Sequence, residues 1–153
     1  MLLNSLQFST GGQCTLTFEK SESWLRATWT GYITNEEAVM GALNYLAQAG
    51  PFHCLYLLND NVHLKGPWFD STRWLEDAWL PQAERLGLRY VAHVVQADTH
   101  HDIMTLKYPP KHVVDSLELQ IFYDLETAEA WLRSCQQPAK PPLTAHQSYR
   151  SLT

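Results

Sequence analysis

The sequence predicts an α/β fold in which helices pack on a mixed, mostly parallel sheet of five strands. Two apolar stretches, 54–58 and 88–95, are hydrophobic at nearly every position, which is typical of strands whose two faces are both covered. A loop and a helical stretch lie between them, so the three segments predict a βαβ unit. In such a unit the loops that follow the strands open at the carboxyl edge of the sheet, where open α/β sheets usually bind their ligands. We therefore expect function at that edge.

The chain has 153 residues, enough for one domain that buries roughly 70% of the surface of its unfolded state. We assign residues 14–135 to this domain. Residues 1–13 are expected to form a flexible N-terminal segment, and residues 136–153 a disordered, proline-rich tail.

The charge balance limits the expected partners. Eleven basic and 16 acidic residues give a net charge of -5 without a block of either sign, so neither nucleic acid nor an anionic membrane is an expected partner. No signal peptide and no membrane span are predicted, and we expect a cytoplasmic protein. The cysteines Cys14, Cys54 and Cys135 lack the paired spacing of a zinc or redox site. We predict no cofactor.

The first predicted elements are a hairpin and a helix. Apolar and polar residues alternate in 14–19 and again in 24–30, which predicts two antiparallel strands at one edge of the sheet. Thr34 and Glu37 form a capping-box pattern, because each side chain can accept a hydrogen bond from the other residue's amide. A helix therefore starts there, and the Gly-Pro pair at 50–51 ends it.

After the first buried strand, the sequence predicts a polar and aromatic loop over 59–69. A helix follows, which starts within 67–71 and ends at Leu86. Pro81 removes the amide that would bond the carbonyl of Asp77, so this helix should be kinked.

The segment 97–117 is harder to assign. A structureless connection of about 20 residues is unusual, so we expect a short helix capped by Asp98 or Thr99 and a further turn over 112–117. A last strand at 119–123 and a last helix from Asp124 follow. The element order is then ββαβαβ(α)βα.

This order resembles the STAS family, the domain of anti-sigma-factor antagonists and of sulfate transporter tails. Several motifs are similar to a bacterial, SpoIIAA-like branch of that superfamily, which is grouped with lipid-transfer CRAL-TRIO domains. They are Leu57-Leu58-Asn59-Asp60-Asn61, Gly66-Pro67-Trp68, Trp74 with Trp79-Leu80-Pro81, Gly87-Leu88-Arg89-Tyr90 and Ala128-Glu129-Ala130-Trp131-Leu132. The resemblance covers residues 14–135 and implies a SpoIIAA-like fold.

The resemblance also implies a regulatory phosphorylation site. The phosphorylated serine of the antagonists lies at the start of the helix after this same strand, and Asp70, Ser71 and Thr72 occupy the comparable place. The amides and dipole of a helix N-terminus favour a phosphate there. Arg73 and Trp74 depart from the family motif, and Asp70 and Ser71 could simply cap the helix.

Other polar and aromatic residues have two interpretations each. His63, His100, His101 and His112 could bind a metal with Asp102, but their spacing is not that of a metal site, and exposed histidines are usually solvated. His93, inside a buried strand, fits a hydrogen-bonded core histidine better than a general base. The run 59–61 could hold a substrate or make a turn.

From these observations we expect a non-catalytic, STAS-like binding or regulatory module that acts on a protein partner through the carboxyl edge of the sheet. A homodimer is compatible with the sequence. The candidate surface comprises Asn59, Asp60, Asn61, His63, Trp68, Phe69, Asp70, Trp74, His100 and His101, with Ser71 and Thr72 as phospho-acceptors.

Two alternative functions stay open. The protein could carry a small apolar or lipid-like ligand in a pocket lined by Trp68, Phe69 and Trp74. It could also be an enzyme that uses Asp60, His63 and either His100 or His101. No nucleophile elbow, phosphate-binding glycine loop or His-Glu zinc motif is present.

Overall fold

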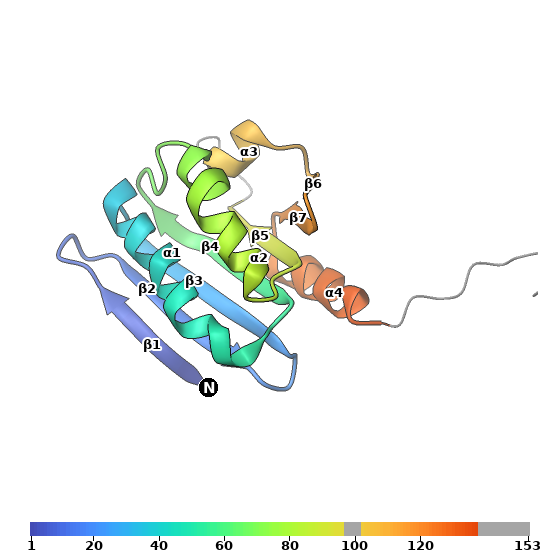
Figure 1. Ribbon diagram of the computed structural model, residues 1–153. Helices are drawn as coiled ribbons and strands as arrows, with labels where there is room; N and C mark the ends of the chain where they lie inside the picture. The colour runs from blue at the N-terminus through green and yellow to red at the C-terminus, as the bar shows by residue number, and fades with distance from the viewer. Residues whose placement is uncertain (97–101, 138–153) are drawn as a thin grey trace, which may run out of the picture.

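A computed structural model describes residues 1–96 and 102–137 of the chain and shows a seven-stranded mixed sheet with helices on both faces (Figure 1). The order of the strands in the sheet is β1-β2-β3-β4-β5-β7-β6. The strands are β1 (Leu2–Gln7), β2 (Gln13–Glu19), β3 (Trp24–Tyr32), β4 (Tyr56–Lys65), β5 (Tyr90–Val94), β6 (Lys111–Val114) and β7 (Leu117–Phe122).

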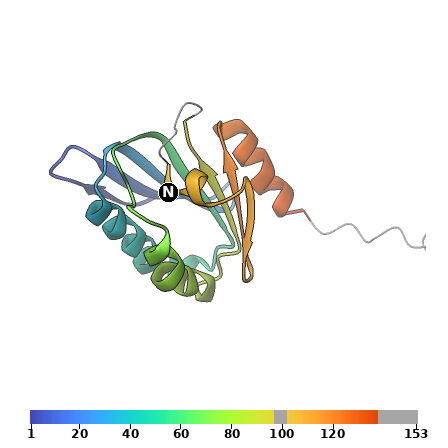
Figure 2. The same cartoon turned by 90° about the horizontal axis from the view of Figure 1, so that it is seen from above.

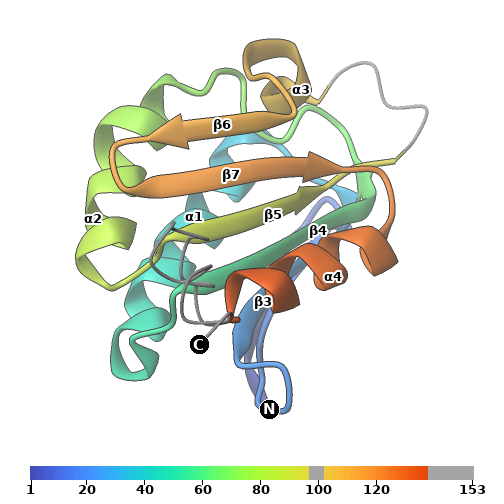
Figure 3. The ribbon, with the colours of Figure 1, turned by 90° about the vertical axis from the view of Figure 1, so that its right-hand side faces the viewer.

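The centre of the sheet is parallel and both edges are antiparallel. β3, β4, β5 and β7 run parallel to one another, while β1 and β2 close one edge and β6 closes the other (Figure 3). The expectation that the two apolar stretches form adjacent, parallel, central strands is confirmed by the pairing of β4 with β5. The α/β class is correct, whereas the predicted number of five strands is wrong.

The helices form two unequal layers. They are α1 (Asn35–Ala49), the 3-10 turn η1 (Gly50–Phe52), the π-helix η2 (Leu75–Trp79), α2 (Leu80–Arg85), α3 (Ile103–Lys107) and α4 (Leu125–Cys135). α1, η2 and α2 cover one face of the sheet, and α4 alone packs on the other (Figure 2). The predicted capping box is confirmed, because Thr34 Oγ1 accepts from the Glu37 amide at 3.2 Å and Glu37 Oε1 accepts from the Thr34 amide at 3.0 Å.

The N-terminal segment is not the flexible stretch that we predicted for residues 1–13. It contains β1, which pairs with β2. Leu3 packs against the core, and Asn4 exchanges two side-chain hydrogen bonds with Asn44 of α1, at 2.7 and 2.8 Å. β1 is short and half polar, and its contacts could not be predicted from its own sequence because each depends on a partner distant in the chain.

β4 is longer than predicted and includes most of the expected loop. The polar run 59–61 suggested a turn, but Asn59 and Asn61 are buried, and the Asn59 amide donates to Asn61 Oδ1 at 3.2 Å. A buried polar side chain that finds a partner is compatible with a central strand. The connection from β4 to the next helix therefore starts at Gly66.

The helix after β4 carries the irregularity expected at Pro81 in the form of a π-helix. The Leu80 amide donates to the Leu75 carbonyl, five residues earlier. This π turn ends two residues before Pro81, which lacks the amide that an α-helix requires. The helix starts at residue 73, after the predicted range of 67–71.

The segment before the last strand also differs from the prediction. α3 is capped by Asp102, whose carboxylate accepts from the Met104 amide at 2.9 Å. The proposed caps Asp98 and Thr99 lie outside the described residues, as does the predicted tail from residue 138 onward. Where we predicted a turn over 112–117, β6 and β7 form a hairpin.

Candidate functional site

A half-open apolar cavity of about 90 Å³ lies between the sheet and its larger helical layer. Its floor is formed by β3, β4, β5 and β7, and its walls by α1, η2, α3 and β6. This volume is several times what one water molecule requires and smaller than the roughly 150 Å³ of an apolar cavity that admits benzene. The space therefore suits one small apolar group.

The floor carries one chain of buried polar side chains. Trp29 Nε1 donates to Asn59 Oδ1 at 2.8 Å, and Asn59 Nδ2 lies 2.9 Å from His93 Nδ1. His93 Nε2 lies 3.0 and 3.1 Å from the two carboxylate oxygens of Asp102. The chain thus connects β3, β4 and β5 to the first turn of α3.

The direction of every hydrogen bond in this chain follows from Trp29. An indole can only donate, so the carbonyl oxygen of Asn59 must face Trp29 and the Asn59 amide group must face His93. His93 Nδ1 is then the acceptor, and the ring proton on Nε2 is donated to Asp102. Burial alone would raise the pKa of Asp102, but His93 and the amides of Met104 and Thr105 hold that pKa below its usual value.

Trp68 closes the cavity from the loop after β4 and has a strained backbone. Its φ of 60° is unusual for a bulky residue, and its amide is fixed by a 2.9 Å bond to the Ile33 carbonyl. The indole stacks on His93, with ring centroids 5.4 Å apart, and meets Trp29 edge to face. Among the described residues, no hydrogen-bond acceptor reaches its buried Nε1. Trp68 and Phe69, which we assigned to the candidate surface, are buried, because they are only 5% and 3% accessible.

A second backbone irregularity lines the same cavity. Leu75, Glu76 and Trp79 of the π-helix all contribute side chains to its wall. Trp79 is held in place by its indole N–H, which donates to the Ala42 carbonyl of α1 at 2.9 Å, and by contact with the Tyr45 ring. Strained and irregular backbone segments concentrate at functional sites.

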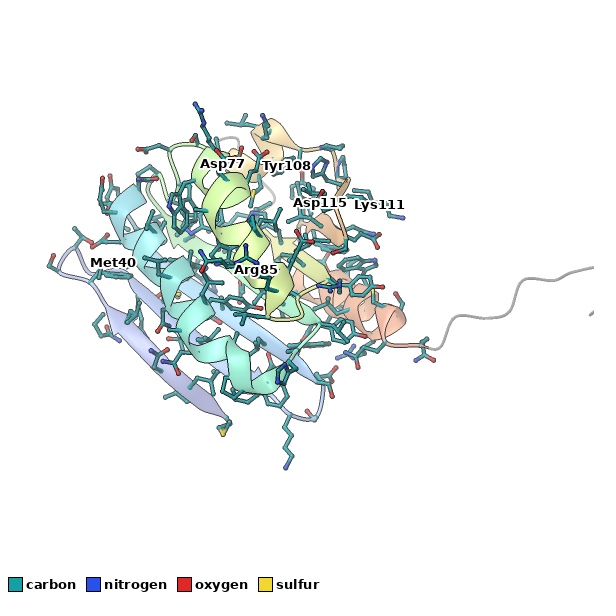
Figure 4. All side chains as sticks on the ribbon, in the orientation of Figure 1. Met40, Asp77, Arg85, Tyr108, Lys111 and Asp115 are labelled. Atoms are coloured by element: carbon teal, nitrogen blue, oxygen red, sulfur yellow. The ribbon has the colours of Figure 1, made fainter. Side chains whose placement is uncertain are left out.

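The cavity wall contains three half-buried polar residues among those described, namely Glu76, Tyr108 and His112. Tyr108 stacks on His112, with centroids 4.3 Å apart. Burial raises the pKa of Tyr108 to about 12, so its hydroxyl stays protonated at neutral pH. Figure 4 shows Tyr108 at the same end of the molecule as Asp77, the residue that follows Glu76.

The residues predicted in the run 59–61 and at 63 do not share one surface. Asn59 lies on the cavity floor, whereas Asp60 points to the opposite face of the sheet and binds Arg26 of β3 at 2.7 Å. Side chains alternate between the faces of a strand, so consecutive residues of β4 separate. His63 is exposed near the end of β4. The expectation that the residues 59–61 and His63 lie together on one surface at the carboxyl edge is therefore wrong.

The helix start separates the two candidate phospho-acceptors. Ser71 is exposed, whereas Thr72 is only 4% accessible and donates from Oγ1 to Glu76 Oε1 at 2.6 Å. Asp70 is exposed, and its amide bonds Asn35 Oδ1 at 2.9 Å. Trp74 is half-buried and stacks on Phe69 but does not line the cavity.

The metal and enzyme hypotheses depend partly on residues that cannot be placed. His100 and His101 lie outside the described residues. Within 1–96 and 102–137, no group of three His, Cys, Asp or Glu side chains could hold a metal ion. In the same part of the chain, no helix is long and apolar enough to cross a bilayer.

Comparison with known proteins gives no assignment. No family model, no curated protein and no solved structure matches the chain. The STAS resemblance therefore stays a hypothesis, and the function must be argued from the site.

Proposed function

We propose that the protein is a non-catalytic binding module for one small, mostly apolar molecule, or for the apolar end of a larger one. This proposal rests on the apolar cavity. Its wall contains both Trp68, whose backbone is in the left-handed region, and the π-helix η2. Each irregularity costs free energy, and a packing defect alone gives no reason for both to border one space.

The aromatic lining supports a ligand more than an empty void. Trp29, Trp68, Phe69 and Trp79 present large ring surfaces to the cavity. A bound apolar group would gain contacts with these rings and remove apolar surface from water.

The polar floor supports binding more than catalysis. His93 is 1% accessible, and both ring nitrogens are already hydrogen-bonded, to Asn59 and Asp102. A general base needs a free nitrogen within reach of the substrate proton. The chain is better suited to fixing the cavity floor and the start of α3.

Native mass spectrometry of freshly purified protein and NMR titration with apolar probes of three or four carbon atoms test the proposal. Ala42→Leu should fill the cavity and abolish binding, while the free energy of unfolding changes by less than about 2 kcal/mol. Ala47→Leu is the matched control, because Ala47 lies on the same helix but is exposed and does not line the cavity. Equal binding by both folded variants would contradict the proposal.

A second candidate function is the STAS-like regulatory interaction with a protein partner at the carboxyl edge. It is favoured by the exposed Ser71, which borders a surface hollow together with Arg73 and Lys107. A phosphate on Ser71 would lie near these two cations and near Glu76 and Asp77, and would change the charge of the surface offered to a partner. Pull-down with Ser71→Asp, compared with Ser21→Asp in an exposed turn, tests this: unchanged partners for Ser71→Asp exclude the switch.

A further inference from the structure

We infer that the ligand of the cavity carries a protonated amine at its polar end, and that the cavity discriminates against carboxylates and phosphates. This inference rests on the proposed binding function and adds the chemical class of the ligand. It follows from the charges of the cavity wall. Among the described residues that line the cavity, Glu76 is the one carboxylate, and none is lysine or arginine.

Glu76 is held in its ionised form. The hydroxyl of Thr72 donates to it at 2.6 Å and is the main cause of a pKa below the usual value for glutamate. Burial is the next largest effect and raises the pKa of Glu76, while the Tyr108 hydroxyl, Lys107 and His112 add to the lowering. The wall therefore presents a negative charge at neutral pH.

The surroundings of Glu76 also suit a cation. Trp79 and Tyr108 line the cavity beside it, and the faces of aromatic rings attract ammonium groups. The Tyr108 hydroxyl stays neutral, because burial raises its pKa to about 12. Lys107 is an opposing charge near Glu76, and both residues border the surface hollow, but Lys107 is exposed to solvent. Its repulsion of a bound ammonium is screened by water and salt.

An anionic end group would meet the reverse situation. A carboxylate or phosphate on an apolar ligand would lose part of its hydration and face Glu76 without a lysine or arginine among the lining residues to pair with. Like charges placed close together disfavour binding. The cavity should thus accept an apolar amine or a neutral analogue and reject a fatty-acid-like molecule.

Three probes that share one propyl chain, small enough for the cavity, separate these cases: propylamine, 1-propanol and butyrate. Their affinities are measured at pH 7 by NMR titration of methyl groups on the cavity floor, such as those of Leu57 and Val91. We expect propylamine to bind at least about fivefold more tightly than butyrate at low ionic strength, with the ratio shrinking in high salt.

Glu76→Gln tests the role of the carboxylate, and Asp77→Asn is the matched control. Both remove one negative charge from the same turn, but Asp77 is exposed, pairs with Arg73 and does not line the cavity. Glu76→Gln should weaken propylamine binding about threefold and leave the affinity for 1-propanol unchanged, whereas Asp77→Asn should preserve both affinities within about 1.5-fold.

The outcomes distinguish the two proposals. If 1-propanol binds but butyrate matches propylamine, or if Glu76→Gln leaves their ratio unchanged, the charge selectivity is wrong and the binding function survives. If none of the probes shifts the floor methyl groups, the binding function itself is wrong and the ligand class falls with it.

Discussion

His93 determines how the polar floor is built, because it lies between an amide that can rotate and a carboxylate that cannot donate. The indole of Trp29 fixes the Asn59 amide, and this in turn fixes the proton of His93 on Nε2. Trp29 on β3 can only donate, and it therefore determines that His93 on β5 donates to Asp102, the cap of α3.

Removing the carboxylate at the end of this chain should destabilise the fold. Asp102→Ala leaves the buried His93 N–H without its acceptor and α3 without its cap, so we expect a loss of about 2 to 4 kcal/mol. Urea denaturation measures this loss. Asp102→Asn keeps an acceptor oxygen and should cost less than half as much; equal losses would mean that the charge alone matters.

Part of the site could be predicted from single residues. The sequence predicts three candidate residues that also line the cavity, namely Asn59, Trp68 and Phe69. Their exposure could not be predicted, because burial of Trp68 depends on a left-handed turn and on stacking with His93. The sequence indicates Asp102 only as a possible metal ligand beside the adjacent histidines. Its actual partner, His93, lies on β5 and could not be identified from the local sequence.

α1 can lie close to the sheet only because residue 41 has no side chain. A Cβ atom at Gly41 would lie 2.3 Å from the Trp29 ring, which is itself pinned by its bond to Asn59. Gly41→Ala should therefore destabilise the protein, since overpacking costs about 1 to 3 kcal/mol against a gain in helix propensity of about 1 kcal/mol.

Gly50→Ala is the control for that substitution. Gly50 has ordinary right-handed helical angles, and a Cβ there would meet nothing closer than Leu86 at 3.8 Å. We expect a gain of about 0.4 to 1 kcal/mol in the free energy of unfolding. A stabilising Gly41→Ala, matching Gly50→Ala, would show that the Trp29 contact is not tight.

Elements with a strong local signal could be predicted, and those that depend on distant partners could not. Both apolar central strands and the capping box that begins α1 are present as expected. We did not predict β1 and β6. Both edge strands are short and partly polar, so little in their own sequences distinguishes them from loops.

The whole molecule should lose stability in acid. The carboxyl groups whose pKa lies below the usual value in the folded state are those of Glu37, Glu76, Asp102 and Asp124. A depressed pKa stabilises the fold at pH values above the unfolded-state pKa, about 3.9 for Asp and 4.3 for Glu, and this contribution is lost as pH falls through the folded-state pKa.

Urea denaturation at a series of pH values measures this dependence. We expect the midpoint to be constant from pH 7 to about 5 and to fall steadily below about pH 4. Asp102→Asn removes one of the titrating groups while retaining its hydrogen bonds, so its curve should be flatter in the acid range. A midpoint that rises on acidification would contradict the sign of these shifts.

The position of β7 between β5 and β6 has a consequence for how a bound molecule enters and leaves. The strands from β1 to β5 are laid down in chain order, whereas β6 and β7 form a hairpin whose second strand docks on the free edge of β5. That hairpin supplies Val114, Leu117 and Leu119 to the cavity wall. The cavity is thus completed by the last hairpin within the described residues. Transient undocking of that hairpin is a natural gate, and we expect occupancy of the cavity to slow amide hydrogen exchange in β7 more than in β2.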